Sequence, residues 1–182
     1  MESGVHVALL RAINVGGTKK LLMADLRAMF EAAGCTDVRT YIQSGNVVFR
    51  AEPALAERIP ALVEAEIVTT KGFEVPVVTR SAAELDAVVT GNPFLAAGAD
   101  PTQLHVGFLA EAPTAARIAE LDPDRSPGDA FEVRGREVYL HFPNGTARSK
   151  LTVDYFDRTL GTTITIRNWR TVGKLREMTG GD

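Results

Sequence analysis

The sequence predicts an α+β protein built from two similar units in tandem. Short runs rich in strand-forming residues alternate with segments whose apolar residues recur at helical spacing. The order of these segments then repeats: residues 104–109 match residues 5–10 position for position, with histidine second in both runs. A length of 182 residues and a hydrophobic share of 45% allow one ordinary domain or two small ones, and the repeat favours two.

The first half is expected to follow the order β-α-β-β-α-β. Its first helix would bury Leu22, Leu26, Met29 and Phe30 on one face and end at Gly34. Turn-forming residues at 44–46 join the two middle strands into a hairpin. The expected strands are 5–10, 37–43, 47–50 and 75–79, and the expected helices are 21–33 and one beginning at Pro53.

The second half is expected to repeat this order after a linking segment. Ser81 and Glu84 have the spacing of a capping box at the start of a helix over 81–89. A break follows at Asn92-Pro93. The expected elements are then a strand at 104–109, a helix at 114–121, a hairpin of 130–134 and 137–142, a helix at 149–160, a strand at 163–166 and a C-terminal helix at 171–178.

This order is that of the split ferredoxin-like plait. We therefore expect one plait in residues 1–80, a linker with a short helix in 81–103, and a second plait with the C-terminal helix in 104–182. Helices on one face of each antiparallel sheet would leave the other face for a partner sheet, a ligand or a second subunit. Ala8, Leu10 and Leu109 are expected on that open face, where their apolar side chains could join two copies into a homo-oligomer.

Charge is unevenly spread along the chain, although the formal net charge is only −3. Residues 144–176 hold seven cationic residues against two aspartates, whereas the rest holds 13 cationic and 21 acidic residues. A cationic segment on an acidic body raises the local concentration of anionic ligands. The single cysteine excludes an intrachain disulfide. Because no apolar run could span a membrane and no leader is visible, we expect a cytoplasmic protein without a membrane partner.

The loop over residues 11–20 has the composition of an anion site. Arg11 and Lys20 supply positive charge, Asn14 supplies an amide, and Gly16 and Gly17 let backbone amides turn inward. The spacing is not that of a phosphate-binding P-loop, and a tight polar crossover loop remains the alternative. Ser44 and Asn46 could offer further neutral hydrogen bonds, or could simply form the hairpin turn.

Two cationic motifs follow in the second half. Arg148 and Lys150 flank Ser149, which would cap the helix at 149–160; cations at a helix N-terminus are understandable if an anion lies between them. In the second motif, Arg167 and Lys174 surround the remaining candidate residues, Asn168 and Trp169.

Asn168 or Thr171 could cap the last helix. Trp169, the only tryptophan, could anchor that helix to the body of the protein, or stack on a planar ring.

Catalytic or metal-binding chemistry has little support in the residues. His6 and His105 occupy matching strand positions and are expected on the faces turned away from the helices, where they could meet if the sheets packed together. Two histidines make a weak metal site without a carboxylate. His141, Ser149 and Thr171 have no visible catalytic partner. The sequence therefore predicts no metal and no cofactor, and leaves any catalytic residue unknown.

Three motifs carry a resemblance to a known family: ALLRAINVGG at 8–17, YIQSGNVVF at 41–49 and TIRNWRTVGKL at 165–175. With Asn144-Gly145 and RSKL at 148–151, the chain resembles the bacterial family catalogued as domain of unknown function 1697. The family pattern has glycine where this chain has Ala12. The resemblance implies a tandem pair of ferredoxin-like units and no established activity.

These observations favour a cytosolic binding protein for an anionic, phosphate-bearing ligand, such as a nucleotide or a nucleic acid. The sequence lacks the run of aromatic residues with which plait-fold RNA binders cover their sheets. Two alternatives remain. One is an enzyme acting on a phosphorylated small molecule, and the other is a structural or dimerising protein that uses an open sheet face.

Overall fold

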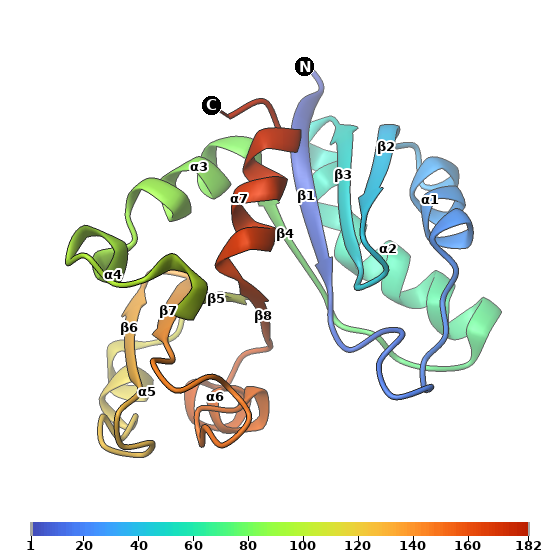
Figure 1. Ribbon diagram of the computed structural model, residues 1–182. Helices are drawn as coiled ribbons and strands as arrows, with labels where there is room; N and C mark the ends of the chain where they lie inside the picture. Colours follow the sequence, from blue (N-terminus) through green and yellow to red (C-terminus); the bar gives the residue numbers. More distant parts are fainter. Residues whose placement is uncertain (1, 182) are drawn as a thin grey trace. The chain divides into compact units, whose positions relative to one another are not determined.

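A computed structural model describes residues 2–181 of the chain (Figure 1). It is an α+β structure with two four-stranded antiparallel sheets and a C-terminal helix, as the sequence predicts. Residues up to Asp86, together with the segment from Leu175 onward, form one compact unit, and Ala87–Lys174 form the other. The division therefore falls within helix α3 (Ala82–Thr90) and again within the C-terminal helix α7 (Trp169–Met178).

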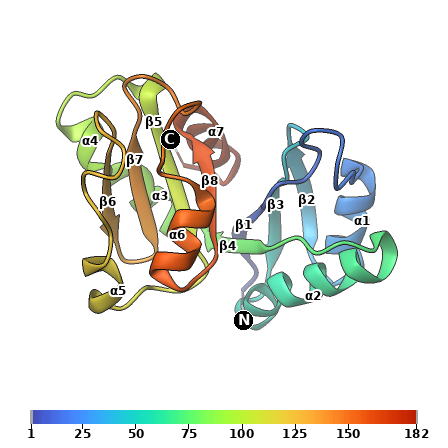
Figure 2. The same ribbon diagram turned by 90° about the horizontal axis from the view of Figure 1, so that it is seen from below.

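The first sheet has the strand order β2-β3-β1-β4. Its central strand β1 is antiparallel to both neighbours and pairs Val7 with Val48 on one side and with Arg80 on the other. Figure 2 shows the two helices of this unit on the same side of the sheet. The elements are β1 (Gly4–Leu10), α1 (Met23–Ala32), β2 (Thr36–Tyr41), β3 (Asn46–Ala51), α2 (Pro53–Lys71) and β4 (Val77–Ser81).

The core of the first unit lies between this sheet and its helices. Ala8 and Leu10 of β1 pack in one cluster with Leu26, Phe30 and Ile59 of the helices. The expectation that Ala8 and Leu10 face away from the helices is therefore wrong. Alternate residues of β1 on the other face are also fully buried, so hydrophobicity along the strand could not tell the two faces apart.

Two apolar residues that the sequence places within a helix and a strand of the first unit lie on its surface, outside those elements. Leu22 precedes α1 as its N-cap residue and is 70% exposed, so it is not part of the buried stripe. Ile42 follows the end of β2 with φ of 49° and is 54% exposed. Both lie where the chain turns, because the helix begins at Met23 and the strand ends at Tyr41, inside the expected bounds 21–33 and 37–43.

The second sheet repeats the arrangement with the order β6-β7-β5-β8. Leu109 of β5 packs with Leu140 and Ile164 of the sheet and with Phe156 and Leu160 of the helix beside it, so its expected outward position is also wrong. The elements are β5 (Leu104–Leu109), α5 (Ala115–Ala119), β6 (Ala130–Arg134), β7 (Glu137–His141), α6 (Val153–Leu160) and β8 (Ile164–Asn168).

The two matching histidines occupy the helix-facing side of their own sheets, opposite to the expected side. His6 stacks on its cross-strand partner Phe49, with ring centroids 5.5 Å apart. His105 meets the edge of Phe142 at 5.1 Å. Each imidazole is thus packed within its own unit, because the strand phase is the reverse of the one that hydrophobicity suggested. Burial lowers the pKa of both histidines below the ordinary value.

The stretch of chain that follows β4 and precedes β5 forms short helices, and the N-terminal cap of the first of them is as predicted. The backbone N–H of Ser81 donates to Glu84 Oε2 at 2.8 Å, and the N–H of Glu84 donates to Ser81 Oγ at 3.2 Å, which completes the capping box of α3. Asn92 then caps α4 (Pro93–Ala96). A 3₁₀ turn, η1 (Pro101–Gln103), leads into β5.

Helix α6 begins later than expected. Its N-cap is Thr152, whose Oγ1 accepts the N–H of Tyr155 at 3.3 Å. Ser149 therefore lies in the preceding loop and does not cap the helix. Serine at 149 and threonine at 152 are equivalent capping candidates in sequence, and only the folded loop decides between them. In the described residues 2–181, no helix has the length and apolar character needed to cross a membrane.

Candidate functional site

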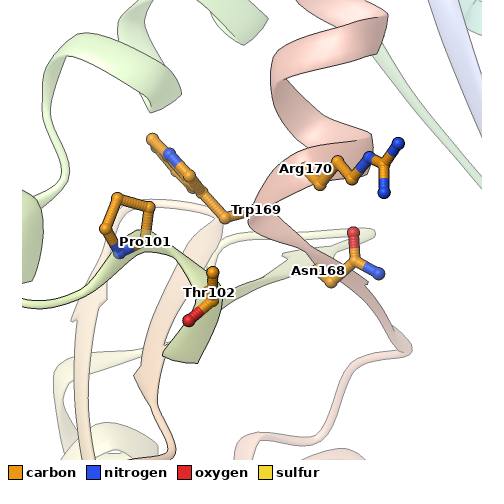
Figure 3. Close-up of a pocket in the computed structure, with 5 residues that line it drawn as sticks. All are labelled: Pro101, Thr102, Asn168, Trp169 and Arg170. Atoms are coloured by element: carbon orange, nitrogen blue, oxygen red, sulfur yellow. The ribbon is translucent and has the colours of Figure 1, made fainter.

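A pocket of about 430 Å³ in the second unit contains the lone tryptophan. It lies where β8 passes directly into α7 and where η1 approaches that junction (Figure 3). Its volume is within the range of small-molecule sites. The residues that line it are Pro101, Thr102, Asn168, Trp169 and Arg170.

Capping interactions hold both sides of this pocket. Asn168 Oδ1 accepts the N–H of the buried Thr171 at 2.8 Å, which fixes the start of α7. Across the pocket, Asp100 Oδ1 accepts the N–H of Thr102 at 2.9 Å and its hydroxyl at 2.8 Å. These bonds lower the pKa of Asp100, so its carboxylate stays ionised and holds η1 in place. Trp169 and Pro101 thus belong to two segments whose conformation is fixed by these capping hydrogen bonds.

Figure 3 shows how the side chains are disposed. The indole of Trp169 lies beside the ring of Pro101, with Thr102 next to it. Asn168 and Arg170 leave the start of α7 on the other side. Arg170 is exposed, and within residues 2–181 the structure gives its guanidinium no ion pair. The site therefore joins an apolar slot to a solvated cation.

Arg167 and Lys174 belong to the same motif but do not line the pocket. Arg167 Nη1 donates to Thr165 Oγ1 at 2.8 Å and to the carbonyl oxygen of Ile166 at 3.1 Å. Burial lowers its pKa to about 10, which still leaves the guanidinium protonated at neutral pH. Arg167 thus supports β8, and Lys174 lies exposed further along α7.

The motif Arg148-Ser149-Lys150 lies in a loop held by a buried serine. Ser126 Oγ donates to Asp129 Oδ2 at 2.6 Å and accepts the backbone N–H of Lys150 at 3.1 Å. Ser149 Oγ accepts the N–H of Leu151 at 3.1 Å. The Arg148 and Lys150 side chains are exposed. Ser149 borders a second pocket of about 320 Å³, which His105 and Phe142 also line.

The loop 11–20 and the hairpin turn 42–46 meet at one end of the first sheet. Asn14 Nδ2 donates to the carbonyl oxygens of Leu21 and Gln43, and its Oδ1 accepts the N–H of Leu21, each at 2.9 Å. The backbone N–H of Leu10 donates to the carbonyl oxygen of Gly45 at 2.8 Å. The Asn14 amide therefore joins three backbone segments of the protein itself.

Among the other predicted ligand-binding residues of the first unit, Ser44, Asn46 and the two glycines have structural roles of their own. Asn46 is fully buried, and its Nδ2 donates to Ser44 Oγ at 2.9 Å. Gly16 and Gly17 form a tight turn with φ of 60° and 75°, closed by the N–H of Thr18 on the carbonyl oxygen of Val15. Arg11 is half-buried, and Lys20 is exposed.

The structure thus unites only part of the predicted site. Asn168 and Trp169 line one pocket together with Arg170, whereas Ser149 borders another and 11–20 belong to the first unit. Sequence reasoning missed Pro101 and Thr102. Asp100-Pro101-Thr102 has the pattern of a capped turn, which signals its geometry but not its approach to Trp169.

No metal centre emerges from the described part of the chain. Residues 2–181 contain no cluster of three or more His, Cys, Asp or Glu side chains that could hold an ion. His141 Nε2 lies 2.9 Å from Gln103 Oε1, in hydrogen-bond contact. Burial raises the pKa of Cys35 to about 11, so this thiol stays protonated at neutral pH.

Comparison with known proteins agrees with the motifs. Residues 4–139 match the family described as protein of unknown function (DUF1697). The chain belongs to this family. The matched DUF1697 region includes the loop 11–20 and the hairpin turn, and it ends before the Asn168–Arg170 part of the tryptophan pocket.

The same fold is found in a solved structure described as the conserved bacterial protein SP0830 from Streptococcus pneumoniae. It shares 23% sequence identity with this DUF1697 chain at a TM-score of 0.73, and the match covers 98% of this chain and 99% of the other. At that identity the similarity shows the fold alone. No curated protein matches the chain.

Proposed function

We propose that this DUF1697 protein binds an anionic, phosphate-bearing small molecule through its second unit. The observation that carries the proposal is the pocket in which Trp169 and Arg170 border one space. Residues 144–174 supply six cationic residues against two acidic ones, which favours an anionic ligand. The start of α7 adds the positive end of its helix dipole.

We extend the proposal to the fold of each unit and to the location of the protein in the cell. The orders β2-β3-β1-β4 and β6-β7-β5-β8 support the assignment of each unit to the ferredoxin-like plait. Residues 1–80 and 104–182 would be the two plaits and 81–103 their linker. We also propose a cytoplasmic location, where phosphorylated metabolites are abundant. The alternative of a dimerising protein rested on Ala8, Leu10 and Leu109 lying on an open sheet face. All three are core residues, so they cannot form that interface.

Calorimetric melting of the full chain with ribose 5-phosphate and with AMP tests this function. A ligand that binds only the folded state raises Tm, by an amount equivalent to about 2.7 kcal/mol at a concentration of 100 Kd. We expect both compounds to raise Tm at millimolar concentration. If neither compound does so, the proposed function is wrong.

Two arginine variants separate a specific site from general charge. Arg170→Ala should weaken AMP binding about tenfold or more, because it removes a charge-assisted hydrogen bond. Arg158→Ala removes the same charge from α6, where Arg158 Nε donates to the Asp154 carbonyl oxygen outside the pocket. Its affinity for AMP should stay close to that of the parent. Equal losses in the two variants would contradict a site at Arg170.

A further inference from the structure

Two rings, the indole of Trp169 and the pyrrolidine of Pro101, line the apolar part of the tryptophan pocket, termed the slot. Trp169 and Pro101 both line the pocket (Figure 3), and each comes from a segment fixed by a cap. Trp169 is half-buried, so part of its ring remains open to a ligand. Stacking on an aromatic face suits every nucleobase, because each base has a π-face.

Charged groups lie beside this slot and not within it. Arg170 is the only charged residue in the lining, and its side chain extends away from the indole. A phosphate placed against Trp169 and Pro101 would lose its hydration without gaining an ionic partner, which is unfavourable. A ligand that fits both parts has an uncharged flat end and an anionic end.

From this arrangement we propose that the pocket takes a mononucleotide, with its base stacked on Trp169 beside Pro101 and its phosphate on the Arg170 side. The inference rests on the proposed function and names the ligand class of the same site. Sugar phosphates without a base would occupy only the cationic part, and they would bind more weakly.

A single nucleotide fits better than a nucleic acid strand. Strand-binding sheets present several exposed aromatic rings in succession. On the side of the second sheet turned away from α6, Phe108 and Tyr139 are buried, and the Tyr139 hydroxyl donates to the Val88 carbonyl oxygen at 3.0 Å. Trp169 therefore offers one stacking position, and the buried rings of Phe108 and Tyr139 cannot extend it.

The pocket has little with which to distinguish one base from another. The Thr102 hydroxyl already donates to Asp100, so its oxygen can only accept a hydrogen bond from a ligand. Asn168 Oδ1 is engaged by the start of α7. We therefore expect AMP and UMP to differ in affinity by less than about tenfold, the difference coming from stacking area.

Tryptophan fluorescence tests the inference directly, because Trp169 is the only tryptophan in the chain. AMP and adenosine should quench or shift its emission saturably, whereas ribose 5-phosphate should bind without this change. Calorimetry should show AMP binding at least tenfold more tightly than ribose 5-phosphate. Trp169→Leu should remove that advantage, so that AMP binds no more tightly than ribose 5-phosphate.

A second variant keeps the test valid if Trp169→Leu destabilises α7. Pro101→Ser alters the opposite wall from the exposed η1 turn and should weaken AMP binding several-fold more than it weakens ribose 5-phosphate binding. Leu95→Ser serves as a matched control, since Leu95 is a partly exposed apolar residue in α4 outside this lining. Its affinity for AMP should remain that of the parent.

The outcomes separate the inference from the function on which it rests. Equal affinity for AMP and ribose 5-phosphate, with no change in emission, overturns the base slot and leaves phosphate binding intact. A different result supports the slot and contradicts the phosphate function. In it, Trp169→Leu abolishes adenosine binding, AMP binds no more tightly than adenosine, and Arg170→Ala leaves AMP affinity unchanged. If no probe binds, both are wrong.

Discussion

Ala12 adopts a backbone conformation that favours glycine, with φ of 56°. A residue with a Cβ is strained in the left-handed region, whereas glycine is not. Ala12 is exposed, so the substitution by glycine creates no cavity. Ala12→Gly should raise the free energy of unfolding by up to about 1 kcal/mol in urea titrations. A measured loss of stability would show that the strain is absent.

His6 and His105 predict a pH dependence of stability. Burial lowers the pKa of both below 6.5, so between the folded and unfolded pKa values the unfolded chain binds more protons. Stability is then complete above about pH 6.5 and falls as the pH drops below it. Tm should decrease from pH 7.5 to pH 5.5. The double variant His6→Phe/His105→Phe should flatten that slope, and an unchanged slope would assign it to other groups.

At the scale of elements, Asn14 is the residue on which one end of the first sheet depends. Its side chain joins the loop 11–20 both to Leu21, just before α1, and to Gln43 in the hairpin turn. Asn14→Ala leaves three backbone groups without these bonds and should cost about 2–3 kcal/mol of unfolding free energy. Lys20→Ala, in the same loop with an exposed side chain, should change it by less than about 0.5 kcal/mol. Chemical denaturation of both variants measures the difference.

Elements were predictable where a short local pattern decides the structure. The capping box of Ser81 and Glu84 formed as expected, because both hydrogen bonds lie within four residues. The start of α6 was not predictable, because Ser149 is engaged by the loop around Ser126, 23 residues earlier. The faces of β1 were assigned in reverse, since Val7 and Ala8 are both fully buried.

At the scale of the whole molecule, the candidate site could be only half predicted. Asn168 and Trp169 follow a strand directly, which marked them as a place where chemistry could gather. Pro101 lies 67 residues before Asn168 in the sequence, and only tertiary folding brings it to the same pocket. Conversely, Asn14 and Asn46 have the composition of ligand groups, yet both bond to the protein's own atoms.

The division into two units predicts which backbone amides respond to a bound ligand. If AMP binds beside Trp169, the saturable shifts in a ¹H–¹⁵N NMR titration should be largest for amides of the second unit around residues 101–103 and 168–171. Amides of the loop 11–20, which is held by Asn14 within the first unit, should move least. Largest shifts in that loop would instead move the site to the first sheet.

The first unit is assembled from two separated stretches of chain, and this bears on how the protein is made. Arg176 Nε donates to Asp86 Oδ1 at 2.7 Å, and the carbonyl oxygen of Met178 accepts from Arg39 Nη2 at 3.0 Å, so the later stretch is bonded to the earlier one. On the ribosome, the complete second unit is synthesised before Leu175 is added. The unit begun first is thus completed last, and until then the nascent chain carries its first sheet without the segment that bonds to Asp86 and Arg39.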